Sequence, residues 1–85
     1  MKNQPDSNNF ITSDFYAAAF LVAKSYRLLG INKADSRRYR FIFTDEPERA
    51  QLVSGYFAGL IEVNARAFVT AIKELKSLMY NNAVN

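Results

Sequence analysis

The sequence contains no cysteine, no histidine and no tryptophan among its 85 residues. Without cysteine the chain has no disulfide bond, no thiolate nucleophile and no ligands for a zinc knuckle. Without histidine it lacks the imidazole that most often serves as a general base or binds a transition metal. Stability therefore has to come from packing or from association with another chain, because so short a domain buries only roughly 60% of its unfolded surface.

Long hydrophobic runs and phosphate-binding loops are also missing. The longest apolar run, Phe15 to Ala23, is too short to cross a bilayer. Residues 1–9 are polar and lack the apolar core of a signal peptide. The three glycines do not form a phosphate loop, and the acidic residues follow no D-x-D-x-D-G or E-x-x-H pattern. We therefore expect a protein of the cytoplasm without a membrane partner, a metal or a cofactor.

The acidic residues offer little for catalysis. Their only cluster is Asp45, Glu46 and Glu48, and carboxylates at the start of a helix are explained by capping and by the helix dipole. No serine has a histidine to activate it, and no S-x-x-K pattern supplies a lysine base. The composition therefore predicts a protein that is not an enzyme.

The positive charge is concentrated in one segment. The chain has a net charge of +3, and residues 24–40 hold six basic residues against the single acid Asp35. The rest of the chain holds five basic and seven acidic residues. Such asymmetry is typical of a surface that binds phosphates or an acidic partner, although a solvated strand face produces the same pattern.

Periodicity predicts three helices and a hairpin. A first helix runs from Ser13 to about Ser25, with Thr12 as its N-cap and an apolar body buried on several sides. Two strands follow within residues 26–44, because aromatic residues alternate with arginines there. Further helices are expected from Asp45 to about Ala58 and, with Asn64 as its N-cap, up to residue 80. The last of these has an apolar stripe of Phe68, Ile72, Leu75 and Met79.

The predicted fold class is α+β, in the order helix, β-hairpin, helix, helix, with the hairpin packed on the helices. Residues 1–9 are expected to be a flexible tail, residues 10–80 a single domain and residues 81–85 a frayed tail.

The hairpin register follows from the hydrophobic pattern. A four-residue loop at residues 33–36 places Tyr26 opposite Phe43 and Leu28 opposite Phe41, giving one apolar face. The other face then mixes three arginines with three aliphatic residues: Arg27, Leu29, Ile31, Arg38, Arg40 and Ile42.

The basic residues of this hairpin suggest non-specific nucleic-acid binding, because guanidinium groups bind phosphates and a two-stranded ribbon fits a major groove. The candidate phosphate contacts are Arg27, Lys33, Arg37, Arg38 and Arg40. The aromatic residues Tyr39, Phe41 and Phe43 are expected in the core, which argues against the readout of single strands. An alternative is that the arginines only keep an open sheet solvated.

The aliphatic residues of the same face suggest a different function. An apolar patch of Leu29, Ile31 and Ile42 edged by arginine has the composition of a protein–protein interface. Two hairpins joined there would make a homodimer. The alternative to nucleic-acid binding is therefore an interaction module, such as an accessory subunit or inhibitor, that docks on a protein partner through the hairpin.

Residues 10–80 also carry a resemblance. The succession of FYAAAFLVAKSYRLLGI, an R-x-x-x-F-x-F strand, DEPE, GYFAG and VNARAFV-x-AIKELKSLMY resembles a family of small bacterial and phage proteins catalogued only as a domain of unknown function. This resemblance implies a microbial or mobile-element setting, where small basic proteins often meet nucleic acid. It assigns no role to any residue.

Overall fold

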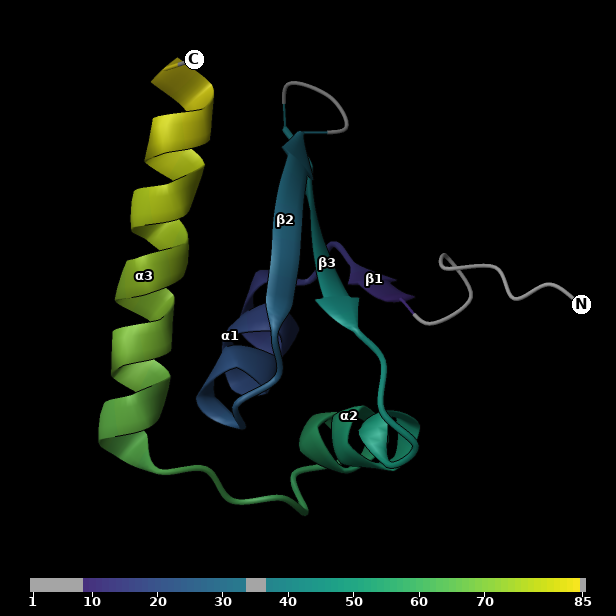
Figure 1. Ribbon diagram of the computed structural model, residues 1–85. Helices are drawn as coiled ribbons and strands as arrows, with labels where there is room; N and C mark the ends of the chain where they lie inside the picture. Colours follow the sequence, from purple (N-terminus) through teal and green to yellow (C-terminus); the bar gives the residue numbers. More distant parts are fainter. Residues whose placement is uncertain (1–8, 34–36, 85) are drawn as a thin grey trace, which may run out of the picture.

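The structure, a computed structural model, describes residues 9–33 and 37–84 (Figure 1). These residues form an α+β domain, which confirms the predicted fold class. In chain order its elements are β1 (Asn9–Thr12), α1 (Phe15–Ala23), β2 (Leu28–Lys33), β3 (Tyr39–Thr44), α2 (Arg49–Phe57) and α3 (Ala65–Val84). The three helices and the β2–β3 hairpin were expected, and β1 was not.

Strand β1 completes an antiparallel sheet in the order β1-β3-β2, so the central strand is β3. Phe10 pairs with Phe43 and Ile11 pairs with Ile42. The sequence suggested that Ile11 and Thr12 lead into the first helix, but these residues alternate between the two faces of the sheet as a strand requires. Asn9, expected in the tail, is the first residue of this strand.

Helix α1 is the centre of the hydrophobic core. Asp14, rather than Thr12, is its N-cap, since the Ala17 N–H donates a hydrogen bond of 2.8 Å to the Asp14 carboxylate. Every residue from Ala17 to Leu21 is fully buried. The three alanines leave room for close approach, and Phe20 stacks on Tyr56 of α2 with 4.7 Å between the ring centroids.

The observed hairpin register differs from the predicted one. Leu28 pairs with Phe43 and Ile31 pairs with Phe41, with a β-bulge at Leu29 that leaves this residue without a partner in β3. One extra residue in a strand reverses which of the following side chains point inward. Uninterrupted alternation, on which the prediction rested, cannot reveal such an insertion.

The bulge separates the three aliphatic residues that were expected on one face. Ile31 packs against the core, on the same side as Leu28. Ile42 lies on the opposite face, opposite Ile11, and Leu29 is 46% exposed at the bulge. The predicted interface of Leu29, Ile31 and Ile42 is therefore not one surface.

Helices α2 and α3 lie where the sequence predicted helices, but their ends differ from the predicted ones. Asn64 caps α3 as expected, because it accepts a hydrogen bond of 2.9 Å from the Ala67 N–H. Helix α2 begins only at Arg49, and Glu48 makes no side-chain capping bond. Helix α3 continues to Val84 and so includes most of the segment that was expected to fray. The predicted apolar stripe of α3 does pack on the core: Phe68, Ile72, Leu75 and Met79.

The bulged register can be tested by introducing a charge at Ile31 or at Leu29. Ile31→Asp should lower the free energy of unfolding by about 2 kcal/mol or more, because it puts a carboxylate against the core. Leu29→Asp should cost no more than about 0.5 kcal/mol, because this side chain is already half exposed. Urea unfolding followed by circular dichroism measures both, and equal losses would contradict the bulged register.

Candidate functional site

The basic residues of the hairpin lie at two ends of the molecule. Arg27 precedes β2, and its carbonyl accepts a hydrogen bond of 3.1 Å from the Thr44 N–H at the base of the hairpin. Lys33 ends β2, six residues and about 20 Å along the strand from Arg27. Arg27 therefore lies apart from the basic residues at the tip, whereas the prediction grouped it with Arg38 and Arg40 on one face.

The other four basic residues gather at the tip of the hairpin. Lys33 pairs with Tyr39, and its ammonium group lies 5.8 Å from the centre of the tyrosine ring. Arg37 and Arg38 directly precede β3, and Arg40 pairs with Asn32 one step along the ladder. All four basic side chains are exposed.

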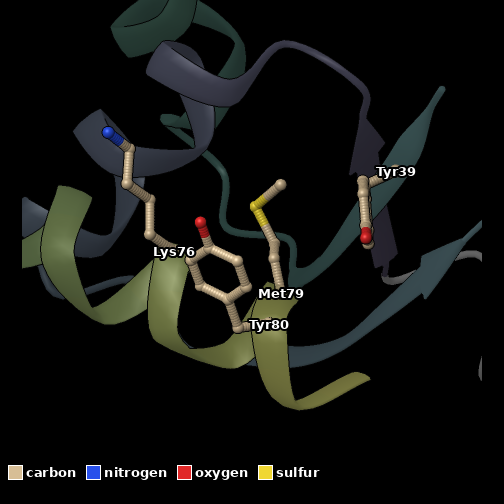
Figure 2. A pocket seen from close by; sticks show the side chains of 4 residues that line it. All are labelled: Tyr39, Lys76, Met79 and Tyr80. Atoms are coloured by element: carbon tan, nitrogen blue, oxygen red, sulfur yellow. The ribbon is translucent and has the colours of Figure 1, made fainter. Parts of the chain in front are cut away.

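A cleft of about 380 Å³ lies between this tip and α3. It is lined by Tyr39, Lys76, Met79 and Tyr80. Figure 2 shows Lys76, Met79 and Tyr80 extending from α3 while Tyr39 projects from β3 on the other side of Met79. Lys76 and Tyr80 are four residues apart and share one helix face. Tyr80 is 73% exposed, so a ligand reaches its ring without any rearrangement of the core.

A second cleft of about 460 Å³ adjoins the first, because Tyr39 and Met79 line both. Its remaining lining comes from the start of α1, the residues before β3 and the inner face of β3: Ser13, Phe15, Arg37, Arg38 and Phe41. Arg38, which directly precedes β3, therefore borders this cleft. Arg40 directly precedes Phe41 in β3, so its side chain points to the opposite face of the sheet.

The two clefts are electropositive. Their lining residues include Lys76, Arg37 and Arg38 and no carboxylate. Within residues 9–33 and 37–84, Arg38 and Lys76 have no ion-pair partner. Because helix α3 and the tip of the hairpin rise side by side in Figure 1, these cations share one end of the molecule.

The acidic cluster of Asp45, Glu46 and Glu48 lies at the base of the hairpin, where β3 leads into α2. Asp45 accepts hydrogen bonds from the Glu46 N–H at 3.0 Å and from Arg49 Nε at 2.9 Å. The bond from Arg49 holds the pKa of Asp45 below its usual value. Burial raises the pKa of Tyr26, and nearby Glu48, Glu46 and Asp45 raise it further. Arg27 follows Tyr26 and so belongs to this acidic end.

Arg49 connects this end to the sheet. Its guanidinium group lies 3.8 Å from the centre of the Phe10 ring, within the range of cation–π attraction. The same side chain holds Asp45, so β1, the β3–α2 connection and α2 meet at one residue.

The sequence did not reveal the contribution of α3 to the clefts. From the sequence, Lys76 could either extend the basic surface or belong to a solvated helix face, and Tyr80 was expected to be the last residue before a frayed tail. Because the apolar stripe of α3 extends to Met79, the sequence indicated that this helix is long. The stripe could not show that a cleft separates the end of α3 from the tip of the hairpin.

No group of side chains suited to a metal ion occurs in the part of the chain that the structure describes. Among the same residues no helix is long and apolar enough to cross a membrane.

The sequence also matches a known family. The family described as Domain of unknown function (DUF5659) matches residues 7–81, which is most of the chain. The chain belongs to this family. No curated protein and no solved structure matches it. As a member of this domain family the chain inherits no assigned activity, so any functional conclusion has to rest on its own residues.

The Asp45–Arg49 pair predicts a pH dependence of stability. Because its folded-state pKa is depressed, Asp45 contributes stability above its unfolded pKa of about 3.9, and this contribution is lost as the pH falls through the lower folded pKa. We expect Asp45→Asn to be less stable than the natural chain by about 0.5–1 kcal/mol at neutral pH. Thermal unfolding should show this difference disappearing below the folded pKa, and a difference that stays constant with pH would contradict the pairing.

Proposed function

We propose that this protein binds nucleic acid non-specifically through the tip of its β-hairpin and the facing part of α3. The observation that carries the proposal is the gathering of cations around two adjoining clefts that no carboxylate lines. Four of them are Lys33, Arg37, Arg38 and Lys76, and Arg40 lies beside them on the other face of the hairpin. Cytoplasmic nucleic acid is the expected partner.

Electrostatics supports this surface in preference to the whole hairpin. Basic side chains bind a nucleic-acid backbone by displacing its condensed counterions, so they must reach several phosphates together. The cations at the tip meet this condition because they come from two elements that stand side by side. Arg27 does not meet it, since it lies beside the acidic residues at the base. The separation of the basic tip from the acidic cluster at the base of the hairpin would also orient the protein as it approaches a polyanion.

The proposal predicts steeply salt-dependent binding to both DNA and RNA. The logarithm of the affinity should fall with the logarithm of the salt concentration by about 0.7–0.9 for each phosphate contacted. Arg38→Glu combined with Lys76→Glu should weaken binding at least about tenfold and flatten this dependence. Fluorescence anisotropy with labelled oligonucleotides measures both effects.

A matched control has the same change in net charge. Arg27→Glu combined with Arg66→Glu alters two exposed arginines, one at the base of the hairpin and one at the start of α3. This variant should keep most of its affinity. Equal losses in the two double variants would show that only net charge matters, and undetectable or salt-independent binding by the natural chain would refute the proposal.

A second candidate function, self-association, is favoured by a separate surface. Ile11 is 53% exposed and lies opposite the half-buried Ile42 on the face of the sheet that points away from the buried Phe41 and Phe43. The sheet order leaves β1 and β2 as edge strands in the described structure. The exposed Ile11 on edge strand β1, next to the half-buried Ile42, fits a symmetric homodimer in which a second copy of the chain is the protein partner.

The dimer proposal predicts a mass in solution of about twice 9.7 kDa. Ile11→Lys should return this mass to that of one chain, because it places a charge in the shared surface. Leu60→Lys is the control, since Leu60 is 78% exposed after α2 and lies outside this face. Light scattering coupled to size exclusion measures the mass, and a natural chain that is monomeric at high concentration would refute the dimer.

A further inference from the structure

The aromatic residue at the tip of the hairpin differs from the two that follow it in the same strand. Phe41 and Phe43 are fully buried, as the sequence predicted, whereas Tyr39 is only half buried and lines both clefts. Tyr39 still packs against the edge of the core, as expected for these three rings, but it is also open to both clefts. With Tyr39 in the cleft, the sequence-based argument against single-strand binding no longer holds.

The first cleft has the lining that a planar aromatic group requires. Tyr39 and Tyr80 present two rings, Met79 lies between them in Figure 2, and Lys76 adds a cation. Aromatic rings stack on nucleobases, and a thioether makes favourable contacts with ring edges. The volumes of the two clefts, about 380 and 460 Å³, lie within the usual range for small-ligand pockets.

The cations around the clefts indicate what the planar group is attached to. Lys33 lies over the Tyr39 ring, Arg38 lines the second cleft and Lys76 lines the first. An aromatic side chain of a protein partner would satisfy the rings but not these charges. An unpaired base carried on a phosphodiester backbone satisfies both, because one phosphate accompanies each base.

We infer that the paired clefts accept unpaired bases, so that the protein selects single-stranded over double-stranded nucleic acid. This inference rests on the nucleic-acid binding proposed above and specifies its substrate class. Bases of a duplex are stacked on one another, and extruding them from the stack is energetically unfavourable. Bases of a single strand reach Tyr39 and Tyr80 without this cost.

The decisive experiment compares ligands that differ only in their bases. The probes are an oligothymidylate of about 12 nucleotides, an oligomer of equal length whose residues are abasic, and the corresponding duplex. The natural chain should bind the oligothymidylate at least about fivefold more tightly than either of the others, since stacking contributes about 1–3 kcal/mol for each base.

Variants of one exposed side chain test the role of the ring. Tyr80→Ala should weaken oligothymidylate binding about fivefold to a hundredfold and leave abasic binding unchanged. Tyr80→Phe should retain the affinity because it keeps the ring. Tyr16→Ala is the matched control, since Tyr16 is 55% exposed and lines neither cleft. Without tryptophan the intrinsic fluorescence comes from tyrosine, so stacking should quench it less in Tyr80→Ala.

The outcomes separate this inference from the proposal on which it rests. Equal, salt-dependent binding to the oligothymidylate and the abasic oligomer would overturn base insertion and leave backbone binding intact. A preference for the oligothymidylate that survives Tyr80→Ala would likewise overturn the assigned cleft. Failure to bind any of the three probes would overturn both proposals.

Discussion

The packing of Phe41 and Phe43 against α1 is the constraint on which the arrangement of the molecule depends. Both rings are fully buried beside a helix that is apolar from Ala17 to Leu21. Since side chains alternate along a strand, this packing turns Tyr39 toward the helices and Arg40 away from them. The central strand therefore determines which residues face α3 and which remain on the open face of the sheet.

The clefts follow from a difference in length between α3 and the elements beside it. Helix α3 has 20 residues, whereas α1 has nine. Its first half packs on α1, and its second half continues beside the tip of the hairpin (Figure 1). There the side chains of α3 meet Tyr39 from only one side, and the space between them remains open. The same geometry brings Lys76 close to the cations of the hairpin, which is why the proposed binding surface lies at this end.

The local sequence pattern predicted most of the helices and strands, because each of these has a clear pattern of apolar residues or a clear capping residue. The apolar body of α1, the alternation in β3 and the Asn64 cap of α3 each determine an element from a few neighbouring residues. Strand β1 was missed because it has four residues and is stabilised mainly by pairing with β3, which is distant in sequence. The bulge at Leu29 was missed for a related reason, since two registers are compatible with the same apolar residues. The candidate site was predicted only in part: the charges of the hairpin were visible, but their partners on α3 depend on tertiary structure.

The most direct test of this account is to map the binding surface by nuclear magnetic resonance. Backbone amide shifts of the labelled chain would be followed during titration with a short single-stranded oligonucleotide. The account predicts that the perturbed amides cluster at the tip of the hairpin and in the C-terminal half of α3, around Lys33, Arg38 and Lys76, while α2 and the base of the hairpin are unaffected. Shifts centred on Ile11 and Ile42, or spread evenly over the chain, would contradict it.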